Sequence, residues 1–151
     1  MPSPSPTIHA SAVLAGRRAV LIRGPSGSGK SQLALALLEA GRAGTLPFAR
    51  LIADDRAEVE AVHGRLVVRP APELAGLIEV RGLGVRRMAF EPLAVVGLVV
   101  DLAAPDAGRM PEPAAERAEI AGISLPRLAV ADRQPPLPLV LSYLRICDEA
   151  D

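Results

Sequence analysis

The stretch that decides the fold is AVLIRGPSGSGKSQLALALLEA, residues 19–40. It opens with a short apolar run, residues 19–22, which is followed by Gly24-Pro25 and predicts a buried strand. Residues 31–40 are rich in Leu and Ala and contain neither Gly nor Pro. They predict a helix that ends at Gly41. The sequence therefore predicts a strand, a glycine-rich loop and a helix in direct succession.

The loop between that strand and that helix, GPSGSGKS at residues 24–31, fits the pattern G-x-x-x-x-G-K-[ST] at every fixed position. Its glycines let successive N–H groups point into one concavity, and the helix start adds partial positive charge. Lys30 can reach the β- and γ-phosphates of a nucleotide, and the Ser31 hydroxyl can ligate Mg²⁺. The alternative is a turn that only joins strand to helix. Sixteen of the seventeen basic residues are Arg, and the single Lys at this position favours the phosphate site.

Composition narrows the class of protein. A chain of 151 residues is long enough for one domain with a buried hydrophobic core. Because only 2% of the residues are aromatic, that core must consist of Ala, Val, Leu and Ile. The zero net charge and the lack of an aromatic platform argue against a nucleic-acid partner. One cysteine, Cys147, excludes an internal disulfide. The longest apolar run, residues 93–100, is too short to span a membrane, and residues 1–6 are no secretory signal, so we expect a cytoplasmic protein.

The rest of the chain predicts mainly strands in an α/β fold. Strands are predicted at residues 48–53, 78–81 and 93–102, and hairpins over 57–68, with a turn near His63-Gly64, and over 120–130. A Pro- and Ala-rich loop covers residues 104–116, and a last helix is predicted at 137–144. We expect one domain at 8–145, between a disordered Ser/Pro leader at 1–7 and a tail at 146–151.

A P-loop needs a metal-coordinating carboxylate at the end of another strand. Asp54-Asp55 end one apolar run and Asp101 ends the most hydrophobic one. Either site fits the role, and the pattern alone leaves both open. Glu79 and Arg81 alternate on a predicted strand and so share a face. They could serve Mg²⁺ and phosphate, or form an ordinary ion pair.

Four segments resemble the catalytic domain of bacterial HPr kinase/phosphorylase. They are IHASAVL at 8–14, LIRGPSGSGKSQLALALLE at 21–39, LIADD at 51–55 and LIEVRGLG at 77–84. The last is similar to the family's own signature and is more specific than a P-loop. The resemblance covers residues 8–141 and is greatest to the short alphaproteobacterial form, which lacks the N-terminal domain of longer enzymes.

The resemblance implies a P-loop kinase core similar to that of phosphoenolpyruvate carboxykinase, in a single domain. It implies an ATP-dependent kinase that acts on a serine of the phosphocarrier protein HPr. It also implies the reverse phosphorolysis, in which inorganic phosphate removes the group and pyrophosphate forms. The implied role is regulation of a phosphotransferase system. The long enzymes are hexamers, so a homo-oligomer is implied as well.

For the nucleotide and the metal, the resemblance transfers to named positions. The residues implied to bind the nucleotide phosphates are Gly24, Pro25, Ser26, Gly27, Ser28, Gly29, Lys30 and Ser31. Arg81 would lie near the phosphates. Ser31 and Glu79 would ligate Mg²⁺, and Asp55 would support the metal or the base.

For catalysis, the resemblance implies that Asp54 is the acid/base group, and that His9 and Lys30 complete its surroundings. A catalytic arginine on a later loop matches Arg109, in PDAGRMPE. The chemistry is coherent, because a serine hydroxyl is a weak nucleophile and an Asp that accepts its proton assists the transfer.

Two other functions fit a bare P-loop. One is a small-molecule kinase, although 151 residues leave little room for lid segments. The other is a nucleotide-binding sensor without turnover. An Asp54→Asn variant distinguishes kinase from sensor, because a kinase would lose turnover yet keep its nucleotide, whereas a sensor would keep signalling.

Overall fold

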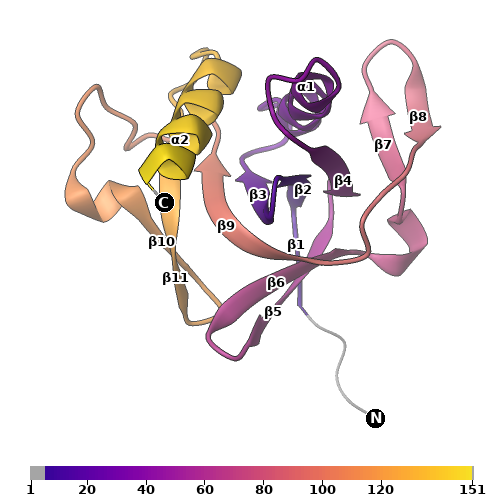
Figure 1. Ribbon diagram of the computed structural model, residues 1–151, viewed down its shortest axis with the longest axis horizontal. Coiled ribbons are helices and arrows are strands. Elements are labelled where there is room, and N and C mark those ends of the chain that lie inside the picture. Colours follow the sequence, from indigo (N-terminus) through magenta and orange to yellow (C-terminus); the bar gives the residue numbers. More distant parts are fainter. Residues whose placement is uncertain (1–5, 151) are drawn as a thin grey trace.

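The computed structural model describes residues 6–150, which form a strongly curved sheet with two helices on one side (Figure 1). The strands are β1 (Thr7–Ile8), β2 (Ala10–Ala15), β3 (Arg18–Arg23), β4 (Ala49–Ala53), β5 (Ala57–Val62), β6 (Arg65–Pro70), β7 (Leu77–Val80), β8 (Gly84–Arg87), β9 (Ala94–Asp101), β10 (Arg117–Ile120) and β11 (Ile123–Ala129). The helices are α1 (Lys30–Arg42) and α2 (Pro136–Ala150), and short 3-10 turns lie at Pro72–Leu74 and Pro113–Glu116.

Strand β9 is the centre of the sheet. Along the main path the order is β1-β5-β6-β9-β3-β2-β4, and β11 pairs with β9 as a branch that carries β10. β9 runs parallel to β3 and β11 but antiparallel to β6. β7 and β8 form a separate hairpin, which stands beside α1 (Figure 1). The loops that follow β3 and β9 therefore leave the sheet at the same edge, where a ligand site is expected in a parallel arrangement.

Both faces of the sheet are buried, which explains the continuous apolar runs of its strands. In β3, Ala19 and Leu21 belong to one core, and Val20 and Ile22 to the other. The second core lies under the helices and includes the inner face of α1, with Leu33, Ala34, Leu37 and Leu38. This spacing of three and four residues is the stripe that a helix needs to pack on a sheet.

A bulge in β9 changes which core its side chains enter. Ala19 pairs with Val96 and Val20 pairs with Leu98, so Gly97 is the extra residue. A Cβ atom on Gly97 would lie 2.7 Å from the Arg18 side chain, so only glycine fits there without movement. Val96 lies in one core and Leu98 in the other.

Most predicted elements are confirmed. The P-loop strand and helix, the strands near 48–53, 78–81 and 93–102, and both hairpins are present. His63 and Gly64 both have positive φ angles, 50° and 78°, as a tight two-residue hairpin turn requires. The second hairpin begins at Arg117, earlier than predicted, and turns at Ala121-Gly122.

Some boundaries differ from the predictions. The last helix continues to Ala150, beyond its predicted end at residue 144, because neither Gly nor Pro interrupts residues 139–150. The predicted leader lies partly outside the described residues, and Thr7–Ile8 pairs with β5. β2 was not predicted. No helix within residues 6–150 is long and apolar enough to span a membrane.

Candidate functional site

The P-loop lies between β3 and α1, and hydrogen bonds between its own residues hold its shape. The Lys30 ammonium donates hydrogen bonds to the carbonyl oxygens of Gly24 at 2.8 Å and Pro25 at 3.2 Å. The backbone N–H of Ser28 donates to the Pro25 carbonyl at 3.0 Å. A Cβ atom on Gly24 would lie 2.5 Å from the Ser28 Oγ, so the loop wraps too tightly for a side chain there. Gly29 precedes the helix with a φ of 101°, which favours glycine.

Asp54 is a buried carboxylate that joins three elements. Its Oδ1 accepts hydrogen bonds from the Ser31 hydroxyl at 2.6 Å and from the Ser11 hydroxyl at 2.7 Å. Its Oδ2 accepts from the backbone N–H of Glu79 at 3.0 Å. Only 6% of Asp54 is exposed, so three donors compensate for a charge that has left water. The P-loop serine, β2 and β7 are thus fixed to one side chain.

Asp55 points the other way, into the pocket. Its φ of 69° is in the left-handed region, and the chain bends at Asp54-Asp55. The backbone there is held by hydrogen bonds from Ala10 N to the Asp55 carbonyl at 3.1 Å and from Arg56 N to the Asp54 carbonyl at 2.8 Å. The two adjacent carboxylates therefore face different surroundings, one buried and one exposed.

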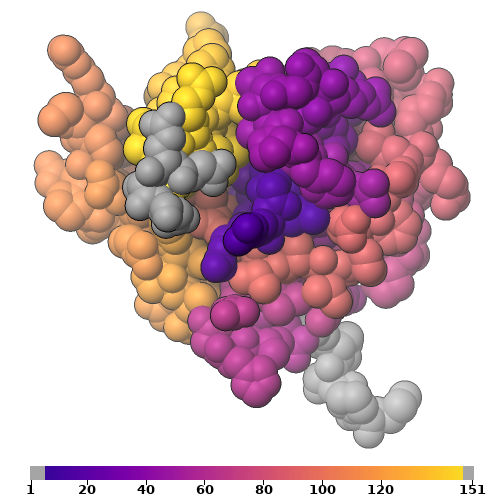
Figure 2. Space-filling model, viewed as in Figure 1, coloured from indigo at the N-terminus to yellow at the C-terminus, as the bar shows by residue number. Residues whose placement is uncertain are grey.

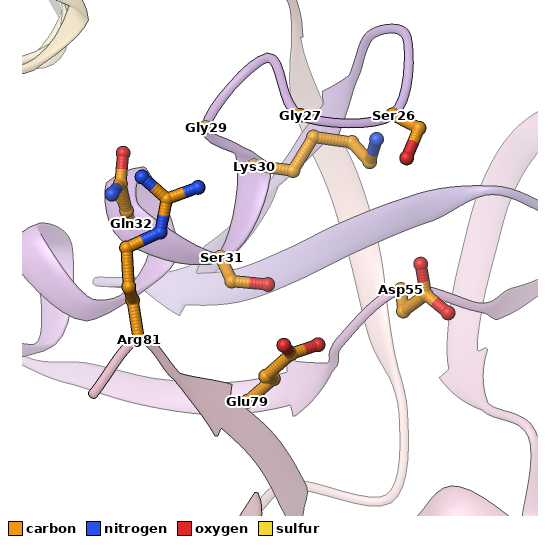
Figure 3. A pocket seen from close by; sticks show the side chains of 9 residues that line it. All are labelled: Ser26, Gly27, Gly29, Lys30, Ser31, Gln32, Asp55, Glu79 and Arg81. Atoms are coloured by element: carbon orange, nitrogen blue, oxygen red, sulfur yellow. The ribbon is translucent and has the colours of Figure 1, made fainter. Parts of the chain in front are cut away.

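The pocket beside the P-loop has a volume of about 240 Å³ (Figure 3). It is lined by Ser26, Gly27, Gly29, Lys30, Ser31, Gln32, Asp55, Glu79 and Arg81. Figure 3 shows the Ser31 hydroxyl and the Glu79 carboxylate turned toward a common space, with Lys30 along the loop above them and Asp55 at one side of it. Cationic and hydroxyl groups thus face two carboxylates across a small polar pocket, a composition suited to phosphate together with a cation.

The β7–β8 hairpin brings Glu79 and Arg81 to this pocket. Ile78 is 1% exposed and packs into the core under α1, which anchors β7. Because neighbouring residues of a strand point to opposite faces, Glu79 is turned away from that core and toward the pocket. Arg81 follows at the end of β7, and Figure 3 shows its guanidinium near the start of α1. The predicted same-face pair thus lies at the P-loop rather than on a remote surface.

The structure distinguishes the two candidate metal carboxylates. Asp101 accepts two hydrogen bonds from Arg23, at 2.7 and 2.8 Å, and another from Arg127. Burial tends to raise the pKa of Asp101, but these two arginines outweigh it and hold the pKa below its ordinary value. Arg127 also binds Asp106 and the Ala115 carbonyl, which ties the loop after β9 to the sheet. The Asp101 charge is therefore engaged in ion pairs, whereas the Asp54-Asp55 pair faces the P-loop.

Two predicted catalytic residues do not line the pocket. His9 is exposed between β1 and β2, one residue before the Ala10 N–H that bonds Asp55. Arg109 is exposed in the loop between β9 and β10, a segment that projects from the body in Figure 2. The structure thus places His9 close to Asp55 along the backbone and leaves Arg109 outside the pocket lining.

Two residues of the site were not predicted. Gln32 lines the pocket from the first turn of α1, directly after the P-loop motif. Ser11 is buried in β2 and contacts both Asp54 and the Asp55 backbone. Its one signal in the sequence is that it is the only polar residue of the strand ASAVLA, which no local pattern connects to the P-loop.

The donor set fits Mg²⁺ with a nucleotide. The part of the chain that the structure describes contains no group of three His, Cys, Asp or Glu residues that could hold a metal unaided. Mg²⁺ usually keeps several waters and is bound through one or two carboxylates together with substrate phosphates. The Ser31 hydroxyl and the carboxylates of Asp55 and Glu79, which line one pocket, supply ligands of that kind.

A glycine-rich loop between a central strand and a helix, next to strand-end carboxylates, defines the class: the chain has a P-loop kinase fold. Residues 3–129 match the family model described as HPr Serine kinase C-terminal domain, and the chain belongs to that family.

Similar proteins include the HPr kinase/phosphorylase of Geobacillus thermodenitrificans, which is 34% identical over 142 residues. That alignment covers 87% of this chain and 44% of the relative. The HPr kinase/phosphorylase of Limosilactobacillus reuteri is 42% identical over 84 residues, 55% of this chain and 24% of the relative. The chain thus spans less than half the length of these curated relatives.

A solved structure, that of the Hpr(Ser) kinase/phosphatase from Coxiella burnetii, matches with a TM-score of 0.74 and 25% identity. The match covers 96% of this chain and 97% of that one.

Proposed function

We propose that this chain transfers the γ-phosphoryl group of ATP to a serine of HPr, and that it also catalyses the reverse phosphorolysis. The observation that carries the proposal is one pocket in which Lys30, Ser31, Asp55 and Glu79 meet beside the P-loop. The family and the names of its similar proteins supply the acceptor, HPr. The same family membership supports ATP as the donor.

In this proposal Asp55 accepts the proton of the acceptor serine. Asp55 is exposed at the pocket, where a serine of another protein can reach it. Asp54 is buried and its carboxylate already binds three donors, so it has no access to an acceptor. The two carboxylates thereby exchange the roles that the resemblance implied.

Asp54 instead positions the groups that bind Mg²⁺. It fixes the Ser31 hydroxyl and, through a backbone N–H, the strand that carries Glu79. We assign Ser31 and Glu79 as candidate ligands, with Asp55 close by. When bound, Mg²⁺ would neutralise charge on the phosphate oxygens.

The forward step balances with groups of the site. As Asp55 takes the proton, the serine oxygen forms a bond to the γ-phosphorus. The bond from that phosphorus to the bridging oxygen breaks, and ADP leaves with the electron pair. Lys30, Arg81 and the loop N–H groups stabilise the negative charge on the transferring group, which is where most catalysis of phosphoryl transfer arises.

In the reverse step an oxygen of inorganic phosphate attacks the phosphorus of phosphoserine. The bond to the serine oxygen breaks, Asp55 returns the proton to that oxygen, and pyrophosphate forms. The same carboxylate thus acts as base in one direction and as acid in the other.

The test is intact mass spectrometry of HPr incubated with this protein, Mg²⁺ and ATP. We expect HPr to gain one phosphoryl group, and to lose it with release of pyrophosphate when phosphate is added. Asp55→Asn should transfer the phosphoryl group about 100-fold to 10,000-fold more slowly while it still binds ADP. A gain that phosphate cannot reverse would restrict the proposal to the kinase direction. No gain, with ATP bound, would reject it in favour of a sensor or a small-molecule kinase.

The sequence also predicts a cytoplasmic location, and the resemblance predicts a homo-oligomer and roles for His9 and Arg109. These stay predictions.

A further inference from the structure

We propose that Ser11 is a positioning residue for phosphoryl transfer, because its hydroxyl sets the placement of both adjacent carboxylates. The inference rests on the proposed function and adds a residue that the P-loop and the signature segment do not contain. Ser11 touches neither the pocket nor a phosphate site, so it acts through Asp54 and Asp55.

Burial is the first support. Ser11 in β2 is fully buried, and within residues 6–147 Asp54 is the only other polar residue that is buried. A buried hydroxyl is costly unless it is hydrogen-bonded, and a strand of small apolar residues would pack equally well with Ala at this position. The hydroxyl is therefore better explained by the contacts it makes than by packing.

Those contacts use the hydroxyl in both directions. The Ser11 Oγ–H donates to Asp54 Oδ1 at 2.7 Å, and the Ser11 Oγ accepts from the backbone N–H of Asp55 at 3.3 Å. The first bond orients the carboxylate that holds Ser31. The second supports a left-handed backbone that non-glycine residues rarely adopt. One oxygen atom thus connects the side chain of Asp54 to the peptide that directs Asp55 into the pocket.

Strand register explains how Ser11 reaches both. Between β2 and β4 the pairing shifts from Val13↔Leu51 to Ala12↔Ala53, so Ile52 is an extra residue on β4. Continued by one residue beyond the end of β4, this register would bring Ser11 opposite Asp54, and the two side chains are hydrogen-bonded. Without the shift Asp54 would be one residue out of step and its side chain would lie on the other face of the sheet. The bulge and the serine therefore work as a unit.

The experiment compares Ser11→Ala with Ala12→Gly. Both change a fully buried position of β2, but Ala12 lies in the apolar core and makes no side-chain hydrogen bond, so its variant weakens the strand at the bulge without removing the hydroxyl. Three quantities are measured for each: the melting temperature, the kcat and KM for ATP with HPr as acceptor, and the affinity for ADP with and without Mg²⁺. Ser11→Thr, which keeps the hydroxyl, tests rescue.

We expect Ser11→Ala to lower kcat by about 10-fold to 100-fold, the usual cost of losing a group that orients a metal-site or catalytic carboxylate. Its KM for ATP should stay close to the wild-type value. The gain in ADP affinity that Mg²⁺ provides should shrink in Ser11→Ala and persist in Ala12→Gly. Ser11→Thr should recover most of the kcat.

The inference is overturned if Ser11→Ala keeps a kcat and a Mg²⁺ effect within twofold of those of Ala12→Gly. The ADP measurement decides the matter even if wild-type protein does not phosphorylate HPr. In that case the proposed function fails on its own, while the Mg²⁺ dependence still shows whether Ser11 positions the site.

Discussion

Ser31 and Asp54 are 23 residues apart in sequence, and the hydroxyl of the first donates a 2.6 Å hydrogen bond to the carboxylate of the second. This contact joins the P-loop helix to the end of β4. It also separates the two acidic neighbours, because Asp54 is committed to Ser31 while Asp55 remains exposed at the pocket. The division of labour that we propose for the two carboxylates rests on this geometry.

The proposed roles of the two carboxylates predict different defects for Asp54→Asn and Asp55→Asn. Asp55→Asn removes the proposed base, so kcat should fall by about 100-fold to 10,000-fold with the affinity for Mg²⁺·ADP retained. Asp54→Asn should chiefly weaken Mg²⁺-dependent nucleotide binding, by about 10-fold or more. Steady-state kinetics and calorimetric titration of ADP with and without Mg²⁺ measure the two effects. The reverse pattern would return the base to Asp54.

The single lysine permits a direct test of the P-loop. Lys30 Nζ is bound to two loop carbonyl oxygens, and we expect it to turn to the phosphates when a nucleotide binds. ATP should then slow acylation of Lys30 by an amine-reactive reagent by about 10-fold, since the ammonium is engaged and covered. Peptide mass spectrometry follows the modified residue, and adenosine, which has no phosphate, is the control. Equal protection by adenosine would contradict a phosphate contact.

A structural feature can be predicted from this sequence when the residues that determine it lie close together along the chain. The P-loop strand, its helix and the tight turn at His63-Gly64 are local patterns, and each is confirmed. A glycine is a less certain signal, because it can end a helix or allow a close contact within it. Gly41 was expected to end the first helix, yet α1 continues to Arg42 and uses Gly41 for a close approach to Ala49.

The site itself was only partly predictable. Asp101 and the Asp54-Asp55 pair look alike in sequence, as acids at the ends of apolar runs. What distinguishes them is the ion pair of Asp101 with Arg23, 78 residues away, which no local pattern contains. Ser11 was missed for the same reason, because its contact with Asp54 depends on a bulge in a neighbouring strand.

The packing of Gly41 gives a prediction about stability. A Cβ atom there would lie 2.6 Å from the Ala49 Cβ and 3.0 Å from its backbone nitrogen. Gly41→Ala should therefore destabilise the fold by about 1–3 kcal/mol, although Ala normally favours a helix. Ala36→Gly in the same helix is the matched control and should cost about 1 kcal/mol through helix propensity. Urea unfolding measures both. An increase in stability for Gly41→Ala would show that α1 lies farther from β4.

Asp101 predicts a pH dependence in the acid range. Burial raises the pKa of Asp101, but the two arginines Arg23 and Arg127 lower it by more than burial raises it. The pKa in the folded protein therefore lies below the unfolded value of about 3.9. The stabilisation is present above that unfolded value and is lost as the pH falls through the folded pKa. Asp101→Asn should cost about 2 kcal/mol at neutral pH, with a difference from wild type that narrows below about pH 4.

Urea titrations at a series of pH values measure that difference. Glu119→Gln, an exposed acid on β10, is the control and should change little at any pH. A difference between Asp101→Asn and wild type that stayed constant down to the lowest pH would show that the Asp101 charge contributes nothing.

The last helix predicts a titration at alkaline pH. Tyr143 is the only tyrosine, and the chain has no tryptophan, so the absorbance of tyrosinate reports on one residue. Burial, followed by a hydrogen bond with Cys147, raises the pKa of Tyr143 to about 12. The midpoint of the tyrosinate titration should thus lie at about pH 12 in the folded protein and at about pH 10 in the denatured chain.

The sign of the stability change follows from these two values. As the pH rises above about 10, the unfolded chain releases the phenolic proton before the folded protein does. The contribution of Tyr143 to the free energy of unfolding is therefore complete below about pH 10 and is lost as the pH rises to about 12. Cys147→Ala should lower the folded midpoint but leave it above the denatured value, because burial is the larger cause. A folded midpoint equal to the denatured one would show that α2 does not pack against the sheet in solution as it does in this structure.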